Sequence, residues 1–253
     1  MVDQDVLTVG PQVSDRPDGR PRWMPFDGFP FANRYARIDG HRIHYVDEGA
    51  GPPLLLAYDG VEAFLWRDVI LRLREAFRCV AVDLPGTGGS TSVEGLQPNP
   101  VGAADVLGSL VRRLDLRDIT VVASGVGGSV SLAMAARSAE RIRAIVAVET
   151  FWGPRSEEGP RTANPRREAA RAVGHLGGVD RSLRTIPRCV PVLLVFGAES
   201  PAVREGAPER WRERFPDAEL LLVDGGHDVP MARDPDLVAR ALTGWWKEEV
   251  GRP

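Results

Sequence analysis

Continuous apolar runs alternate with amphipathic stretches along most of this chain, and this alternation limits the folds it can adopt. The apolar runs lie near 52–60, 79–86, 119–124, 144–151, 190–198 and 218–226. They are typical of strands covered on both faces. The stretches 61–77, 100–116, 127–142 and 235–250 carry apolar residues three and four apart, as helices do. The order predicts an α/β fold with a mostly parallel sheet, helices on both faces and function at the carboxyl ends of the strands.

The chain of 253 residues suits one large domain. Residues 1–33 are rich in Pro, Gly, Asp and Arg and are predicted to form an irregular arm. The core domain is assigned to 34–152 and 189–253, and the polar stretch 153–188 to a short cap insertion above the sheet. Asp39-Gly40 between two alternating runs predicts a hairpin at the sheet edge, where His41 and His44 are interpreted as surface or structural residues.

The charge pattern argues against several classes of partner. The formal net charge is −3 and the basic residues are spread along the chain, which favours neither nucleic acid nor an anionic membrane. No export signal or membrane-spanning run is recognised, so we expect a cytoplasmic protein. Cys79 and Cys189 lack metal-ligand spacing and are expected to pack in the core, with a thiol nucleophile as the alternative. The oligomeric state is left open.

Four blocks of the sequence resemble one family. They are FPFANRYARIDGHRIHYVDEG, AVDLPGTGGS, RRLDLRDITVVASGVGG and GGHDVP. In order and spacing they are similar to the haloalkane dehalogenase and epoxide hydrolase branch of the α/β-hydrolases, from about Phe29 to Trp246. The resemblance implies an α/β-hydrolase fold, here with a reduced cap, an apolar pocket for a small molecule, and neither a cofactor nor a metal.

The nucleophile of such a fold lies on a sharp strand-to-helix turn flanked by small residues. The segment 123–127 fits that frame and places Gly125 where the resemblance implies an aspartate. Gly125 has no side chain, so no ester intermediate can form there. The alternative nucleophile is Ser124, but that frame puts Val122 and Val126 where the turn needs small residues.

The loop after the first parallel strand also departs from the family pattern. Asp59-Gly60-Val61 stands where the resemblance implies His-Gly-Asn-Pro or His-Gly-Glu-Pro. Val61 and Val126 replace the two halide contacts, which disfavours dehalogenation. The amides of these two valines could still face a developing oxyanion. Tyr58 and Gly60 are further candidates for the lining of the pocket.

The resemblance implies a catalytic histidine at His227 and an acid that sets its tautomer. The acid position after the strand at 190–198 is Ser200, beside Glu199. A second family position matches Glu149, so a Glu149–His227 dyad is predicted, with structural roles for both residues as the alternative. Asp59 is a further candidate acid or base, or a turn-forming residue before the adjacent glycine.

Two functions remain open from the sequence. The first is a repurposed enzyme that uses His227 without a covalent intermediate on an apolar small molecule, for example a polyketide intermediate. Its reaction would be cyclisation, dehydration, elimination, isomerisation or water-activated hydrolysis, and Trp152 would line its pocket. The second is a noncatalytic descendant that binds a ligand or stabilises a partner.

Overall fold

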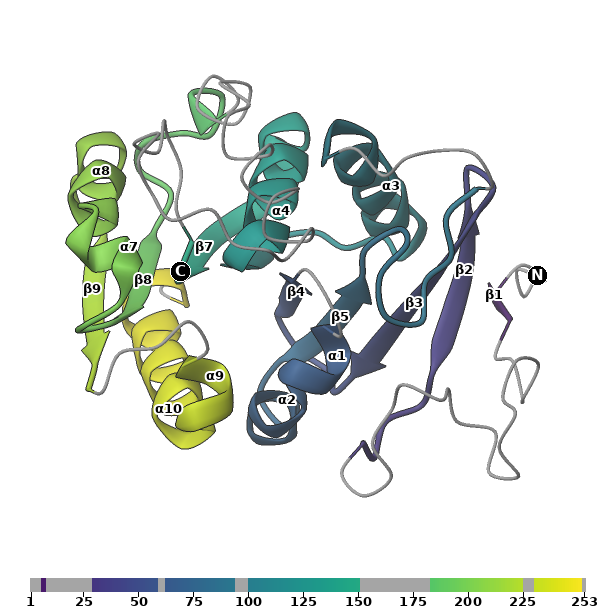
Figure 1. Ribbon diagram of the computed structural model, residues 1–253, viewed down its shortest axis with the longest axis horizontal. Coiled ribbons are helices and arrows are strands. Elements are labelled where there is room, and N and C mark those ends of the chain that lie inside the picture. Colours follow the sequence, from purple (N-terminus) through teal and green to yellow (C-terminus); the bar gives the residue numbers. More distant parts are fainter. Residues whose placement is uncertain are drawn as a thin grey trace.

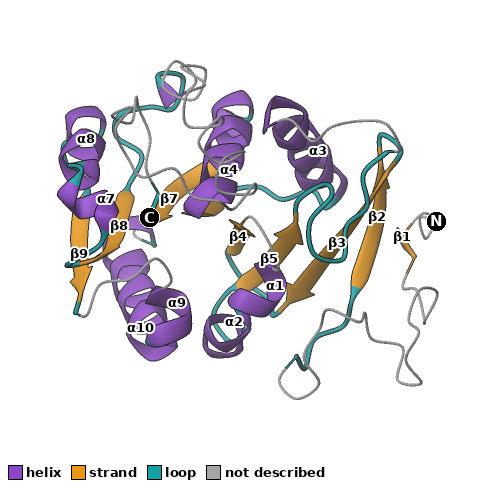
Figure 2. Cartoon of the chain, viewed as in Figure 1, coloured by secondary structure: helices purple, strands orange, loops and turns teal. Residues whose placement is uncertain are grey.

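In the computed structural model, the chain forms a nine-stranded sheet with helices on both faces (Figures 1 and 2). The structure describes residues 6–7, 29–58, 62–93, 100–150, 183–224 and 230–251. The strands are β1 (Val6–Leu7), β2 (Arg34–Ile38), β3 (His41–Glu48), β4 (Pro53–Tyr58), β5 (Arg78–Asp83), β6 (Ile119–Ser124), β7 (Ile142–Val148), β8 (Val192–Gly197) and β9 (Glu219–Val223). Their order in the sheet is β1-β2-β3-β5-β4-β6-β7-β8-β9. Strands β4 to β9 pair in parallel, which confirms the predicted mostly parallel sheet.

The predicted hairpin is present between β2 and β3, which pair antiparallel. Asp39 and Gly40 have φ of 48° and 81°, and two successive positive φ values are typical of the type I′ turn that matches strand twist. The predicted position at the sheet edge is wrong, because β1 pairs with β2 and β3 pairs with β5. His41 and His44 are also buried, and the predicted irregular arm contributes the short strand β1.

Helices cover the two faces of the sheet (Figure 1). One face carries α3 (Pro100–Arg113), α4 (Gly125–Arg137) and α8 (Ala207–Arg214), and the other carries α1 (Glu62–Leu65), α2 (Arg67–Leu73), α9 (Pro230–Arg233) and α10 (Pro235–Trp245). Shorter elements are η1 (Ala139–Arg141), α7 (Pro201–Arg204) and the π-helical turn η2 (Trp246–Val250). Among the described residues, no helix has the length and apolar character needed to cross a bilayer.

Several helices, including α1, α2 and α8, differ from the sequence prediction. The stretch 61–77 forms α1 and α2 rather than one helix, because Trp66 leaves regular helical geometry at φ −88° and ψ −3° while its side chain is fully buried. Helix α8 was not predicted. Its sequence APERWRER is polar, and only Ala207, Pro208 and Trp211 are buried, so it shows little apolar periodicity.

The sheet separates two hydrophobic clusters. Val121 and Ala123 of β6 face the cluster that includes the buried side of α3 and α4, whereas Val122 faces the cluster that includes α2 and α10. All residues of β6 and β8 are buried. Burial on both faces explains why these strands read as continuous apolar runs rather than alternating ones.

The strand order reverses direction at β4. The chain passes from β4 to β5 on one side and then returns to β6 on the other side of β4. In open α/β sheets, such a switch point leaves a crevice at the carboxyl ends of the two diverging strands, where ligands bind. The carboxyl ends of β4 and β6 therefore position the candidate site.

Candidate functional site

A sharp turn joins β6 to α4 at this end of the sheet. Ser124 is still extended, with φ −135° and ψ 137°, and Gly125 begins the helix with φ +54°. A positive φ is the left-handed region that glycine adopts at least cost. The prediction that Gly125 heads the helix on a tight strand-to-helix turn is confirmed, and no side chain projects from the apex.

Ser124 does not occupy that apex. Its side chain is fully buried, and its Oγ has no hydrogen-bond partner among the described residues. In β6 it shares the face of Val122, because alternate residues of a strand point the same way. The extended backbone of Ser124 and the positive φ of Gly125 place Gly125, rather than Ser124, at the apex of the turn.

The start of α4 lies very close to the end of β7. A Cβ atom on Gly128 would lie 2.7 Å from Oγ1 and 2.9 Å from Cγ2 of Thr150. Thr150 Oγ1 in turn donates a hydrogen bond of 2.7 Å to the carbonyl of Ala123. Gly128, the second glycine of the pair, thus permits close packing between the strand-to-helix turn and the segment that follows β7.

Glu149 follows β7 in a strained conformation. Its φ is +50°, a region that costs a non-glycine residue about 1–2 kcal/mol. Its amide donates to the Val195 carbonyl at 3.0 Å, and its Oε1 accepts a 2.5 Å hydrogen bond from the Gly197 amide. The carboxylate is therefore fixed across the carboxyl ends of β7 and β8. Strained residues held by several contacts are concentrated at functional sites.

Thr150 links the segment after β7 to helix α8. Its carbonyl accepts a 2.9 Å hydrogen bond from Nε1 of Trp211, on α8. The supporting roles of Thr150, Gly197 and Trp211 were not predicted from the sequence. Thr150 directly follows Glu149 in the chain, whereas only the pairing of β7 with β8 brings Gly197 to Glu149.

The alternative acid position has a structural role. Ser200 is fully buried and caps α7, accepting a 3.2 Å hydrogen bond from the Val203 amide. Serine is a favoured residue at the N-cap because its oxygen satisfies an orphan helical amide. The neighbouring Glu199 is exposed to solvent. Of the described candidate acids, Glu149 is the one held at the strand ends.

Several predicted site residues fall outside the described residues. They are Asp59, Gly60, Val61, Trp152 and His227. Tyr58 ends β4 and Val126 lies in the first turn of α4, but their side chains are not among those described. Three predictions therefore stay predictions: the Glu149–His227 contact, the opening of the space at Gly125 toward His227, and the pair of oxyanion amides.

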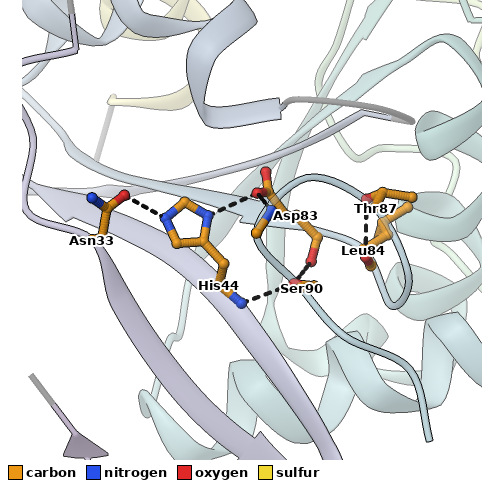
Figure 3. A network of polar contacts seen from close by, with 7 residues as sticks. Asn33, His44, Asp83, Leu84, Thr87 and Ser90 are labelled. Atoms are coloured by element: carbon orange, nitrogen blue, oxygen red, sulfur yellow. Dashed lines mark hydrogen bonds and ion pairs between the residues drawn. The ribbon is translucent and has the colours of Figure 1, made fainter. Parts of the chain in front are cut away.

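A second polar cluster lies beside the loop that follows β5 (Figure 3). Nδ1 of His44 is 2.8 Å from Oδ2 of Asp83, and Nε2 is 2.8 Å from Oδ1 of Asn33. The Gly89 amide donates to the same Asp83 oxygen at 2.6 Å. Both ionisable side chains are 0% exposed. Asn33 is half-buried, and we call Asn33, His44 and Asp83 the buried triad after its two ionisable members.

The buried triad has the connections of a structural brace. Ser90 Oγ donates to the main-chain carbonyl of Asp83 and accepts from the His44 amide, so its hydroxyl does not bond to the imidazole. A Cβ on Gly88 would lie 2.1 Å from the Asp83 carboxylate, and one on Gly89 would lie 2.9 Å from the His44 ring. The glycines in DLPGTGGS thus let the loop close over the pair, which ties β3 to the end of β5.

The two cysteines differ in environment. Cys79 is buried in β5, as predicted, whereas Cys189 is exposed, so the prediction that it packs in the core is wrong. Cys189 precedes the first buried residue of β8, where the apolar run has not yet entered the sheet. Within the described part of the chain, no cluster of three His, Cys, Asp or Glu side chains could hold a metal ion.

We expect thiol reagents to modify Cys189 and to spare Cys79 in the folded protein. Burial, with the nearby Glu48 and Asp47 charges, raises the pKa of Cys79 to about 12. About one Cys79 thiol in 10⁴ would be ionised at pH 8, and the thiolate is the reactive form. Labelling with a chromogenic disulfide checks this: Cys189→Ser should abolish fast labelling and Cys79→Ser should leave it. Fast labelling that survives Cys189→Ser would contradict it.

Comparisons with known proteins agree with this architecture. A model described as the alpha/beta hydrolase fold matches residues 61–170. A crystal structure of a mutant haloalkane dehalogenase from Agrobacterium tumefaciens superposes with a TM-score of 0.68 at 19% identity, covering 88% of this chain and 98% of that one. The chain therefore has the α/β-hydrolase fold.

Curated relatives match about half of the chain. "Haloalkane dehalogenase 2" of Mycobacterium tuberculosis is 39% identical over 127 residues, which cover 50% of this chain and 44% of that protein. "Cis-3-alkyl-4-alkyloxetan-2-one decarboxylase" of Shewanella oneidensis is 28% identical over 125 residues, covering 48% and 39%. The matches span less than half the length of these relatives. Homologues of the chain are thus dehalogenase-like or decarboxylase-like enzymes of the hydrolase fold.

Proposed function

We propose that this chain is an enzyme that acts on an apolar small molecule through non-covalent acid/base chemistry by His227. The observation that carries the proposal is Gly125 at φ +54° on the strand-to-helix turn, where the fold presents a nucleophile and this chain presents no side chain. An enzyme at this site must work without a covalent intermediate on that residue.

The geometry of Glu149 supports a retained acid/base pair. Its carboxylate is fixed at the ends of β7 and β8 by the Gly197 amide, despite the strain of its backbone. A fixed carboxylate can orient a histidine and stabilise its protonated form. In this proposal His227 abstracts a proton from the substrate or from water, and the amides of Val61 and Val126 stabilise the developing oxyanion.

Such chemistry would support cyclisation, dehydration, elimination or direct hydrolysis of an apolar substrate, for which a biosynthetic intermediate such as a polyketide is one example. The relatives add support, because similar sequences bear the names of a dehalogenase and of a decarboxylase. The branch thus includes enzymes named for different reactions.

One observation favours a noncatalytic alternative. Ser200 occupies the other acid position and serves as a helix cap, so one part of the family's machinery has become structural. A ligand-binding or partner-stabilising protein would also tolerate glycine at position 125. This alternative predicts binding of apolar ligands without turnover.

The expected result for an enzyme is turnover that depends on His227. We would screen native protein on aryl esters, epoxides and β-hydroxyketones, and expect His227→Ala to lower kcat by about 10²- to 10⁴-fold, the usual contribution of a general base. Glu149→Gln should also lower kcat, whereas Glu199→Gln, a neighbouring exposed carboxylate, should not. Intact-mass spectra of protein quenched during turnover should show no covalent adduct.

Three outcomes would count against the proposal. A covalent adduct would show that a nucleophile was overlooked, with Ser124 as the first residue to map. Turnover unchanged by His227→Ala would remove the base. Thermal stabilisation by apolar ligands, with no turnover of any substrate in the screen, would favour the noncatalytic alternative.

A further inference from the structure

Strand β9 ends the sheet on the side opposite β1, and no other strand of the described structure pairs with its outer edge (Figure 1). It pairs with β8 in parallel and in continuous register from Glu219 to Val223. The strand contains three consecutive leucines and one charged residue, the exposed Glu219 at its start. Proline, lysine and a bulge, which often block pairing at a sheet edge, do not occur in this strand.

The hydrogen-bonding groups of this edge can be assigned from one bond. The Val223 carbonyl accepts from the Ala198 amide, so it points toward β8. Because the direction of the main-chain groups alternates along a strand, the N–H and C=O groups of Leu221 and Glu219 also point toward β8. Leu220 and Leu222 therefore direct their N–H and C=O groups away from the sheet.

The side chains of the same two leucines differ in exposure. Leu220 packs partly against the cluster that includes Trp211 of α8. Leu222 lies on the same face two residues further on and is 47% exposed. Among the described residues, Val101, at 48%, is the other large apolar side chain with comparable exposure.

We propose that β9 pairs antiparallel with β9 of a second copy of this chain, with Leu221 of each copy on the two-fold axis. In that register Leu220 lies opposite the partner's Leu222, and each such pair exchanges both N–H···O bonds. The exposed leucine side chain is covered by the partner's leucine on the same face of a continuous sheet.

The charges of the edge favour the antiparallel orientation of a second copy over the parallel one. Glu219 lies near Glu248 and Glu249, and burial together with these two charges raises its pKa. Parallel pairing in register would place Glu219 beside its own equivalent, which is destabilising. Antiparallel pairing places Glu219 opposite the partner's Val223 and sends the two acidic groups to opposite ends of the shared edge.

The expected interface is small, so the dimer should be reversible. A single edge of this length lies at the weak end of protein–protein contacts, below the standard area of about 1,600 Å². We would measure sedimentation equilibrium of the full chain from low micromolar to near-millimolar concentration. Native protein should shift from monomer to dimer, and Leu222→Lys should remain monomeric throughout. Val101→Lys, matched in exposure, should dimerise like native protein.

Hydrogen exchange gives a readout that needs no variant. Peptides covering 219–223 should exchange more slowly at the concentrations where the dimer forms, because the outward amides of Leu220 and Leu222 become bonded. Native protein that stays monomeric at the highest concentration would overturn the proposal. A dimer that persists in a folded Leu222→Lys variant would also overturn it. A native dimer whose peptides covering 219–223 gain no protection from exchange would overturn it too.

Discussion

Gly125→Asp is expected to release halide from haloalkanes at least about 10⁴-fold more slowly than a working dehalogenase, if each missing halide contact resembles an oxyanion donor worth about 10² to 10³. The backbone does not cause this failure. Gly125 lies at φ +54°, and aspartate is among the residues that enter the left-handed region most readily. The substitution therefore places a carboxylate on the turn without restoring the groups that stabilise the leaving halide.

The missing halide contacts would act in the transition state of dehalogenation. The resemblance implies halide contacts at positions 61 and 126, and both are valine in this chain. A departing halide that is not stabilised raises the barrier even when the nucleophile is correctly placed. In this hypothesis the loss of covalent chemistry at Gly125 and the loss of halide binding occurred together.

Halide release can be measured on a haloalkane panel for native protein, Gly125→Asp and the neutral isostere Gly125→Asn. The Mycobacterium tuberculosis dehalogenase-like relative, assayed beside them, provides the reference rate. Robust turnover by Gly125→Asp alone would show that the glycine was the one essential loss, and that the argument from Val61 and Val126 was wrong.

Asp83→Ala is expected to lower the free energy of unfolding by about 3–5 kcal/mol, the usual cost of breaking a buried pair by removing one partner. Asp83 and His44 are 0% exposed, and Asp83 also accepts from the Gly89 amide. Its removal leaves the buried imidazole and the loop amide without this acceptor.

Urea denaturation at neutral pH measures this effect. Asp105→Ala is the control, because Asp105 forms an ion pair with Arg137 at 3.5 Å but is 60% exposed, and such pairs contribute about 0–1 kcal/mol. The double variant His44→Ala/Asp83→Ala should lose less than the sum of the two single variants, since the residues are in contact. Equal losses for Asp83→Ala and Asp105→Ala would contradict the role of the buried triad as a brace.

Local patterns in the sequence predicted much of the fold. The runs that became β4 to β9 were recognised because strands buried on both faces are continuously apolar, and Asp39-Gly40 specified its turn through positive φ values. The turn at Gly125 was predicted from small residues around a strand-to-helix junction. These features depend on neighbours in the chain, so a sequence can display them.

Long-range contacts decided the rest. Neither the burial of His44 nor its contact with Asp83 could be predicted, because both depend on β3 pairing with β5 and on the loop at Gly88 and Gly89 closing over the two side chains. The exposure of Cys189 likewise depends on where β8 enters the sheet.

For the candidate site, the sequence by itself determined that Gly125 removes the side chain at the strand-to-helix turn and that Glu149 is a candidate acid. Only the tertiary structure decided that the Glu149 carboxylate is held by the Gly197 amide and that Ser200 caps a helix instead. The physical reason is that periodicity reports which face of an element is buried, whereas strand order and register determine which distant groups come within hydrogen-bond distance.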